Sequence, residues 1–347
     1  MKRLRVGWVL DTSPKRTWAL PWDRLSPVAQ IRFGGIARHL KNTDEFHMEQ
    51  YRPWVRYDAV VFVKIMSDAA FELARALKKR GTRVLFDTNV NYYESWGDFV
   101  VPGTEPTPVQ QNEARRMTES ADAVVADSSY LMDLCKKLNP KTTFIPDAVD
   151  TDFFRPAARS SAASGPLTLI WSGIGKKAYH LEVIEKLLVD LKSNVRLVLV
   201  PSRPTSYDPP APVLERLQKA MGATLVYWDY RRYRDLLSAS DLVISPKHLS
   251  SSYEMAHTEY KITLGMAMHL PALASAQRSY IEAIGDGVGG QICATPEEWR
   301  TVLERYLSDR HLLEIHGAQA RDRVVARYAI PVVAQQYARF LQEVCLS

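Results

Sequence analysis

Residues 258–290 read TEYKITLGMAMHLPALASAQRSYIEAIGDGVGG, and the order of elements in this stretch decides the fold class. The run Lys261–Met268 begins with a charge and is too long for a buried strand, so it predicts a buried helix. Pro271 ends that helix, and Ala272–Ala274 predicts a short buried strand. A second short helix is expected at Tyr280–Ile284. Helix, strand and helix with several small residues indicate a closely packed parallel α/β unit.

The carboxyl edge of this strand, residues 275–280, is where the sequence places a ligand site. In open parallel sheets, ligands bind beyond the carboxyl ends of the strands, close to the N-terminus of the next helix. Ser275 and Tyr280 bound this edge and are therefore candidate binding residues.

The same alternation of strands and helices runs through the chain in two successive blocks. Ala, Ser and Pro dominate residues 156–166, which are the expected linker between the blocks. Two such blocks predict an α/β protein with two doubly wound, Rossmann-like domains. The expected strands are Leu4–Leu10, Ala59–Val63, Arg83–Phe86, Ala123–Ala126, Thr143–Ile145, Leu167–Trp171, Val195–Val200, Leu225–Trp228, Leu242–Ser245 and Ala272–Ala274.

The charge of the chain is mildly basic and evenly spread. The 347 residues carry a net charge of +6, with 45 Lys and Arg against 39 Asp and Glu. Residues 1–150 and the remainder each contribute half of that excess. Because nucleic-acid-binding proteins usually concentrate their basic residues, this distribution argues against a nucleic-acid partner. Anionic small molecules and anionic lipid surfaces remain compatible with it.

The cysteines and the apolar runs indicate a cytoplasmic protein. Cys135, Cys293 and Cys345 are far apart and fit reduced thiols better than disulfides or a zinc site. The start Met1–Arg5 leads into a short strand and not into a signal-peptide core. No apolar run reaches the ~20 residues of a membrane span. We therefore expect a cytoplasmic location, with peripheral contact at the inner membrane face left open.

Residues 121–156 read ADAVVADSSYLMDLCKKLNPKTTFIPDAVDTDFFRP and resemble the end of the first domain in GT-B glycosyltransferases of the family 4 type. An IPNGVD…F.P segment recurs there, and Asp147-Ala148 takes the place of its Asn-Gly. Further segments match the family in the right order along nearly the whole chain. They are Gly34-Gly35, Ser172-Gly173, YRDLLSASDLVIS at 233–245, Lys261–Ser275, YIEAIGDGVGG at 280–290 and Tyr328.

The resemblance implies that a sugar moves from a nucleotide-sugar donor to an acceptor hydroxyl on a polysaccharide, a glycolipid or a small glycoconjugate. Residues 1–155 would form the acceptor domain, residues 166–328 the donor domain, and residues 329–347 a helix that returns to the first domain. The nucleotide sugar is a substrate, and the resemblance implies no cofactor and no metal. The leaving nucleoside diphosphate gains negative charge during the reaction, so preorganised donors aimed at it accelerate the step.

Four residues of the second domain are expected at the diphosphate. Lys261 stands where family members carry a lysine at the start of the donor-facing helix, although it could equally pair with Glu259. Gly173 follows the first strand of the domain, where a glycine also permits a tight turn. Lys176 and Lys177 follow it, although such lysines usually form a solvated face.

Further candidates are distributed over both domains. Glu259 and Glu282 are expected at donor hydroxyls, with helix capping as the other interpretation of Glu282. Gly35 is expected to open a helix and to close over the phosphate. Asp87 ends a strand of the first domain, where it would orient or deprotonate an acceptor hydroxyl, or else form an Asx turn.

One departure from the family keeps the alternatives open. The two glutamates of the E-x7-E motif correspond to Ala256 and Leu264, so the retaining stereochemistry expected of the family has no support here. One alternative is another GT-B enzyme, such as a sugar-nucleotide epimerase. The other is a non-catalytic partner subunit that binds nucleotide sugars. An NAD oxidoreductase fits poorly, because Gly173-Ile174-Gly175 lacks the third glycine of a dinucleotide fingerprint.

Overall fold

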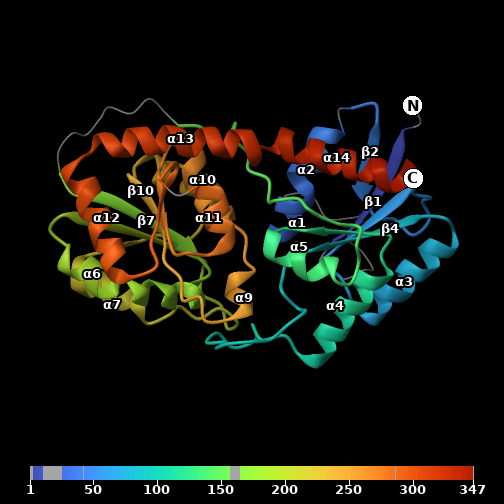
Figure 1. The fold of residues 1–347 in the computed structure, drawn as a ribbon, viewed down its shortest axis with the longest axis horizontal. Coiled ribbons are helices and arrows are strands. Elements are labelled where there is room, and N and C mark those ends of the chain that lie inside the picture. The colour runs from blue at the N-terminus through green and yellow to red at the C-terminus, as the bar shows by residue number, and fades with distance from the viewer. Residues whose placement is uncertain (1–2, 11–25, 42, 157–164, 286, 347) are drawn as a thin grey trace. The chain divides into compact units, whose positions relative to one another are not determined.

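A computed structural model describes residues 3–10, 26–41, 43–156, 165–285 and 287–346, and it divides into two compact units (Figure 1). The first unit comprises Met1–Asp150, Ser251–Thr258 and Arg327–Ser347, and the second comprises Thr151–Ser250 and Glu259–Ala326. Most of the linker expected at residues 156–166 lies outside the described residues.

The first unit is built on a parallel six-stranded sheet in the order β2-β1-β3-β4-β5-β6. Its strands are β1 (Leu4–Val9), β2 (Phe46–Gln50), β3 (Ala59–Val63), β4 (Arg83–Thr88), β5 (Ala123–Ala126) and β6 (Thr142–Phe144). Its helices are α1 (Pro27–Ala29), η3 (Gln30–Gly34), α2 (Gly35–Leu40), α3 (Asp68–Lys79), α4 (Pro108–Ser120), α5 (Ser129–Lys136), α9 (Ser252–Met255) and α14 (Ile330–Leu346). All five residues of β3 are buried, as expected for a central parallel strand covered on both faces.

Hydrophobic side chains cover both faces of this sheet. On one face, Phe33, Ile36 and Tyr337 from η3, α2 and α14 pack on β1 and β3. On the other, residues of α3, α4 and α5, among them Leu77 and Met117, pack on β3 and β4. Figure 1 shows α2 and α14 on one side of the sheet and α3 and α4 on the other. The C-terminal helix therefore belongs to the core of the first unit, as the family resemblance predicts.

Side chains at helix starts account for where several helices of the first unit begin. The Ser67 hydroxyl accepts a hydrogen bond from the Ala70 amide at the start of α3. Thr107 and Gln110 form a reciprocal capping box at the start of α4. These polar caps satisfy amides that have no partner inside the helix.

The second unit repeats the architecture with the strand order β12-β11-β10-β7-β8-β9, again parallel. Its strands are β7 (Leu167–Gly173), β8 (Val195–Pro201), β9 (Thr224–Leu225), β10 (Leu242–Ser245), β11 (Ala272–Ala274) and β12 (Gly290–Ile292). Its helices are η4 (Gly175–Val183), α6 (Glu185–Asp190), α7 (Val213–Met221), α8 (Tyr230–Ser238), α10 (Tyr260–Ala267), α11 (Arg278–Ile284), α12 (Pro296–Ser308) and α13 (His311–Arg327).

Close contacts to glycines set the packing of α10 in this unit. A Cβ at Gly265 would lie 2.8 Å from the Val243 Cβ, so α10 rests directly on β10. A Cβ at Gly317 would lie 2.2 Å from the His269 carbonyl oxygen, so α13 rests on the turn that follows α10.

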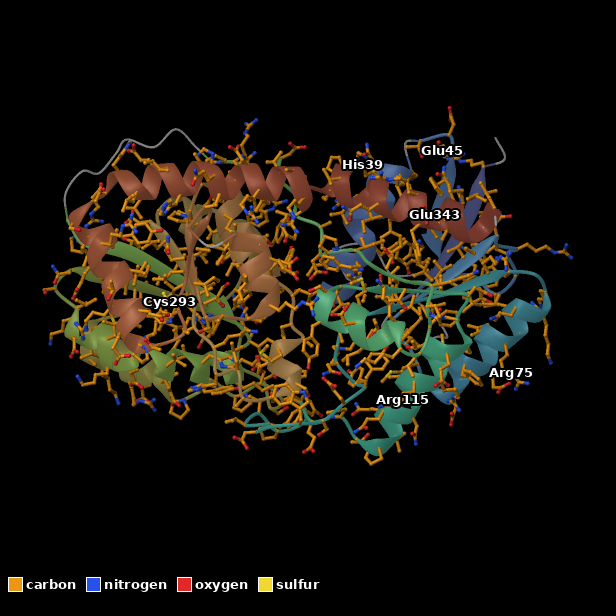
Figure 2. All side chains as sticks on the ribbon, in the orientation of Figure 1. His39, Glu45, Arg75, Arg115, Cys293 and Glu343 are labelled. Atoms are coloured by element: carbon orange, nitrogen blue, oxygen red, sulfur yellow. The ribbon has the colours of Figure 1, made fainter. Side chains whose placement is uncertain are left out.

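Cys293, labelled in Figure 2, is 1% exposed in the core of this unit, whereas Arg75 of the first unit is exposed.

Three differences between the structure and the sequence analysis concern the architecture of the units. Strands β2 and β12 were not expected; both are short edge strands, and only one residue in β12 is buried. Gly34 and Gly35 lie inside a helical stretch that begins at Pro27, so they do not open a helix. Residues 251–258, assigned from sequence to the second domain, belong to the first unit.

Candidate functional site

The carboxyl edge of the second sheet gathers several of the residues that the sequence analysis selected. Strand β7 ends at Gly173, β10 at Ser245 and β11 just before Ser275. Ser245 pairs with Ala274 across β10 and β11, so the ends of these two strands are level. Because parallel strands bring their carboxyl ends to one edge, this is the edge at which ligands bind in open α/β sheets.

Gly173 and Lys261, both predicted from sequence, lie together at this edge. The Lys261 Nζ is 3.4 Å from where a Cβ at Gly173 would stand. The same ammonium lies 5.9 Å from the centre of the Trp171 ring, within the range of a cation–π contact. A side chain at residue 173 would crowd the Trp171 ring, which is 3.0 Å from the Cβ position. The glycine thus leaves space for a lysine ammonium over an aromatic ring.

Ser275 and Tyr280 hold the neighbouring strand ends in place. The Ser275 hydroxyl accepts a hydrogen bond of 2.8 Å from the Lys247 amide. The Tyr280 hydroxyl is hydrogen bonded to the Ser245 hydroxyl at 2.9 Å, and its side chain is fully buried. These contacts give both residues a structural role at the edge, and neither side chain presents an open surface to a ligand.

Lys247 is a functional candidate that the sequence analysis missed. Its side chain is 5% exposed, and its ammonium lies 5.3 Å from the centre of the Tyr280 ring. Burying an ammonium is costly without compensating contacts, so lysines are rarely buried unless they are paired. The signal in the sequence was a lysine two residues after the strand Leu242–Ser245, at the edge where ligands bind.

The backbone amides that follow Gly173 already have partners within the fold. The Lys176 amide donates to the Asp208 carboxylate at 2.8 Å, and the Gly175 amide donates to the Ser202 hydroxyl at 2.8 Å. Ser202 in turn donates to Asp208. This carboxylate occupies the start of η4, which is where an anion is favoured. Lys177 is 6% exposed and so is not part of a solvated face.

The predicted glutamates have different surroundings. Glu259 directly precedes α10 and is 1% exposed. Glu282 lies in α11, and its carboxylate pairs with Arg278 at 3.3 Å in a partly exposed ion pair. The two positions of the absent E-x7-E motif, Ala256 and Leu264, are buried as apolar residues. The buried glutamate next to Lys261 is the carboxylate that best fits a ligand site.

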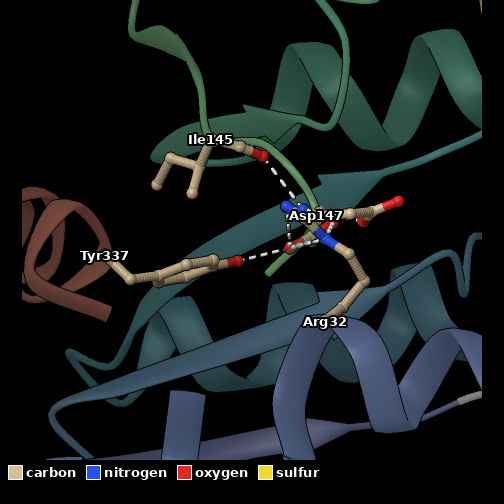
Figure 3. A network of polar contacts seen from close by, with 5 residues as sticks. Arg32, Ile145, Asp147 and Tyr337 are labelled. Atoms are coloured by element: carbon tan, nitrogen blue, oxygen red, sulfur yellow. Dashed lines mark hydrogen bonds and ion pairs between the residues drawn. The ribbon is translucent and has the colours of Figure 1, made fainter. Parts of the chain in front are cut away.

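In the first unit, a buried polar network surrounds Asp87 (Figure 3). The Arg32 guanidinium donates to Asp87 through Nε at 3.1 Å and through a terminal nitrogen at 3.1 Å. Its other terminal nitrogen donates to the Ile145 carbonyl at 2.9 Å and to Asp147 at 3.2 Å. The Tyr337 hydroxyl also donates to Asp87. One arginine therefore connects η3, β4, the segment after β6 and, through Asp87, the C-terminal helix α14.

Burial and charge perturb the protonation of this network. Burial tends to lower the pKa of Arg32, but Asp87 and Asp147 outweigh it and hold that pKa well above its ordinary value. Burial raises the pKa of Asp147, against the opposing effect of Arg32. Burial and the adjacent Asp87 carboxylate raise the pKa of the Tyr337 hydroxyl. The arginine stays charged and the phenol stays protonated at neutral pH.

These contacts favour a structural role for Asp87 over that of an acceptor base. Its carboxylate is fully buried and accepts from both Arg32 and Tyr337. A general base needs hydrogen-bond reach to the proton that it abstracts. The sequence analysis did not select Arg32; its only signal was a lone arginine in the apolar stretch 28–37.

Gly35 also has a packing explanation. A Cβ at this position would lie 2.9 Å from the Ile330 Cδ1 of α14, which is closer than side chains tolerate. Gly34 and Gly35 both have right-handed helical backbone angles. The amide of Gly35 is thus inside a helix and not at a helix N-terminus, where free amides would meet a phosphate.

Neither a metal cluster nor a membrane-spanning helix occurs in the described part of the chain. No three His, Cys, Asp or Glu side chains gather there as metal ligands. Among the described helices, none is long and apolar enough to cross a membrane. The absence of a metal requirement stays a prediction.

Solved structures of glycosyltransferases resemble this chain over most or all of its length. A glycosyltransferase from Rickettsia africae matches with a TM-score of 0.68 at 14% identity, over 99% of both chains. HepE from Anabaena, solved with UDP-glucose, matches with a TM-score of 0.67 at 14% identity, over 98% of this chain and 100% of that one.

Sucrose-phosphate synthase from Thermosynechococcus elongatus matches with a TM-score of 0.67 at 16% identity, over 83% of this chain and 74% of that one. No family model matches the chain, and no curated protein matches it. At these identities the likeness establishes the fold. The predicted GT-B architecture of two Rossmann-like units is confirmed.

Proposed function

We propose that this protein is a glycosyltransferase that transfers a sugar from a nucleotide-sugar donor to an acceptor hydroxyl. The likeness to HepE, which was solved with UDP-glucose, supports a nucleotide-sugar donor. The match covers 98% of this chain and 100% of that one, so the likeness includes both units. The fold alone is shared by enzymes of many activities, and the argument for chemistry has to come from the site.

The observation that carries the proposal is the Lys261 ammonium beside Gly173 and Trp171. When the bond from sugar to diphosphate breaks, negative charge grows on the leaving phosphate oxygens. A lysine at the carboxyl edge of β7, next to a glycine that lets phosphate approach, offers preorganised positive charge for those oxygens. Lys247, a lysine that is 5% exposed, adds a second ammonium to this edge of the sheet. The buried Glu259 carboxylate is suited to accept from donor hydroxyls.

The acceptor side of the proposal is a sugar or a lipid-linked glycoconjugate. The proposal includes peripheral contact with the inner membrane face, with which the evenly spread net charge of +6 is compatible. The proposal includes transfer without a metal, so turnover is expected to persist in the presence of EDTA.

A binding panel tests the donor site. The melting temperature is measured with nucleoside diphosphates and their sugars, since a ligand at a hundred times its Kd stabilises the fold by ~2.7 kcal/mol. Lys261→Ala is expected to weaken binding of the preferred diphosphate about 10- to 100-fold, because a charged hydrogen bond contributes about 1.5–3 kcal/mol. Lys186→Ala is the matched control, because Lys186 is a 92% exposed lysine of the same unit.

Two outcomes would contradict the proposal. Unchanged diphosphate affinity in Lys261→Ala would remove the lysine from the donor site. If no nucleoside diphosphate in the panel raised the melting temperature, a nucleotide-sugar donor would be excluded. Tight binding without turnover over a broad acceptor panel would instead favour the non-catalytic alternative, which the apolar Ala256 and Leu264 keep open. Interconversion of the free nucleotide sugar would favour an epimerase.

A further inference from the structure

The amino edge of the first sheet carries an exposed tryptophan. Strand β3 begins at Ala59 and β4 at Arg83, and Trp54 lies in the segment that leads into β3. Its side chain is 66% exposed. An indole combines an apolar ring with a polar N–H group, and tryptophans are enriched where water meets lipid. A single exposed apolar residue needs no explanation by itself, so the surroundings of Trp54 decide what it means.

Two segments that are distant in sequence meet at this edge. The Thr82 hydroxyl donates to the Tyr57 carbonyl at 3.0 Å. The Arg83 amide donates to the Asp58 carbonyl, also at 3.0 Å. These bonds hold the basic run KKRGTR, which ends α3 and begins β4, beside the segment that contains the exposed indole. Neither segment is a long basic block in the sequence, and the fold brings them together.

Cations dominate the exposed side chains of the two segments. We call the following exposed residues the amino-edge patch: Trp54, Arg56, Lys79, Arg80 and Arg83. Among the described residues, none forms an ion pair with the four cations of this patch.

The carboxylates at this edge are held by other groups. The Asp58 carboxylate accepts from the Arg5 amide at 2.8 Å. The Asp122 carboxylate accepts from the Val84 amide at 2.8 Å, and it pairs with Lys78 at 3.1 Å. The amino-edge patch therefore presents positive charge that no described carboxylate neutralises, together with an exposed indole.

The patch lies away from the edge at which ligands bind in open α/β sheets. Such ligands bind beyond the carboxyl ends of the strands, which for β4 is the end that carries Asp87 and Thr88. The amino-edge patch is at the start of β3 and β4 instead. A large partner on the patch would thus leave the carboxyl edge of this sheet open.

We propose that the amino-edge patch docks the protein on an anionic lipid surface. Anionic headgroups attract Lys and Arg side chains, by roughly fivefold in affinity for each residue near the surface. The indole of Trp54 enters the headgroup layer, where its ring and its N–H group are both accommodated. Proteins that bind single-stranded nucleic acid stack successive bases on several aromatic rings, and this patch offers one. The inference rests on the membrane contact included in the proposed function and is independent of the donor site.

Binding of the full chain to lipid vesicles tests the patch. Vesicles of phosphatidylcholine alone are compared by flotation with vesicles of equal parts phosphatidylcholine and phosphatidylglycerol. We expect binding to the anionic vesicles only, weakened by added salt because salt screens exposed charges. A blue shift of the tryptophan fluorescence is expected on binding, and Trp54→Phe should abolish it. Equal binding to both kinds of vesicle would contradict the inference.

Matched charge reversals separate the patch from net charge. Lys79→Glu combined with Arg83→Glu is expected to lower the affinity for anionic vesicles at least ~20-fold. Lys192→Glu combined with Arg196→Glu is the control, because these residues are also exposed, also four apart and also at the start of a strand, in the second unit. The control should bind like the wild type. An equal loss of affinity in both double variants would overturn the inference.

Two further measurements identify the partner and keep the donor test separate. A single-stranded oligonucleotide that bound more tightly than anionic vesicles, and no longer bound to Lys79→Glu with Arg83→Glu, would overturn the inference in favour of nucleic acid. Melting temperatures of both double variants, with and without nucleoside diphosphate, are expected to match those of the wild type. Failure of vesicle binding therefore leaves the donor site intact, and failure of diphosphate binding leaves the docking surface intact.

Discussion

His269 occupies a backbone conformation that glycine usually takes at the end of a helix. Its φ is 62°, and it follows α10 in a Schellman turn in which the Leu270 amide donates to the Gly265 carbonyl. The left-handed conformation costs a non-glycine residue about 1–2 kcal/mol. Glycine avoids this cost, but it loses about 0.5–1 kcal/mol more conformational entropy on folding. We therefore expect His269→Gly to stabilise the second unit by up to about 1 kcal/mol, measured by urea unfolding.

His269→Ala provides the control for that substitution. Alanine keeps the left-handed strain and removes the imidazole, so the stabilisation should be absent. If His269→Gly destabilised the protein, the imidazole would have to make contacts stronger than the strain of its backbone.

His316 gives the second unit a pH-dependent stability. Its ring is 7% exposed, and its Nδ1 is hydrogen bonded to the Tyr306 hydroxyl at 2.7 Å. Burial, helped by the nearby Arg305, lowers the pKa of His316 below its ordinary value of 6.5. The folded state therefore favours the neutral ring. As the pH falls, the unfolded state binds the proton at a higher pH than the folded state does. The contribution of His316 to the free energy of unfolding is fully present above about pH 6.5. It is lost as the pH drops toward the pKa of the folded state.

The pH profile of a variant measures this contribution. We expect wild-type unfolding free energy to fall more steeply between pH 7 and pH 5 than that of His316→Gln. Only the difference in slope matters, since the substitution also changes stability at every pH. Parallel profiles for the two proteins would show that His316 titrates alike in the folded and unfolded states.

The sequence predicted some residues of the candidate site and missed others. Gly173 and Lys261 were predicted and do lie together, because each follows from its place in a strand or at a helix start. Arg32 and Lys247 were missed, because a charged residue in a sequence is expected at the surface and their burial depends on distant partners. The partners of Arg32, at 87 and 147, are far from it in sequence.

At the scale of elements, the contact between α2 and α14 explains Gly35 without a ligand. A Cβ at Gly35 would overlap the Ile330 side chain at the start of α14. We expect Gly35→Ala to destabilise the first unit by about 1–3 kcal/mol, as overpacked cores do. The effect should be measured by denaturant unfolding.

A second substitution distinguishes packing from phosphate binding at this position. Ile330→Val removes the atom that lies 2.9 Å from the added Cβ, so the double variant should regain part of the lost stability. If Gly35→Ala leaves stability unchanged and weakens nucleoside diphosphate binding, the original expectation for Gly35 holds and the packing explanation does not.

Elements with strong local signals were predicted well. The sequence predicts helices over Val213–Met221 and Pro296–Ser308, and these are the bounds of α7 and α12, because amphipathic spacing and, for α12, a Thr295 cap define them locally. Strands β2 and β12 were missed because edge strands are stabilised by backbone pairing with one neighbour and carry little hydrophobic pattern. The sequence also predicts a helix from about Leu181 to Lys192, where the structure has the end of η4 followed by α6.

At the scale of the whole molecule, the sequence predicts two successive α/β units. It does not predict all the residues that belong to each unit. Alternating strands and helices in two blocks indicate two α/β units whatever the details of each strand. Residues 251–258 belong to the first unit through contacts made far away in sequence, such as the bond from the Ser128 hydroxyl to the Ala256 carbonyl. No local pattern encodes such a contact, so sequence alone assigned the segment to the block that surrounds it.

The first unit contains residues from the start, the interior and the very end of the chain. A ribosome synthesises α14 after every segment of the second unit, so the apolar face that Val333 and Leu341 cover stays exposed in the nascent polypeptide until α14 emerges. The second unit, whose segments all emerge earlier, is complete before the first one can close. A stop codon within α14 therefore damages the unit whose strands are all encoded before the second unit.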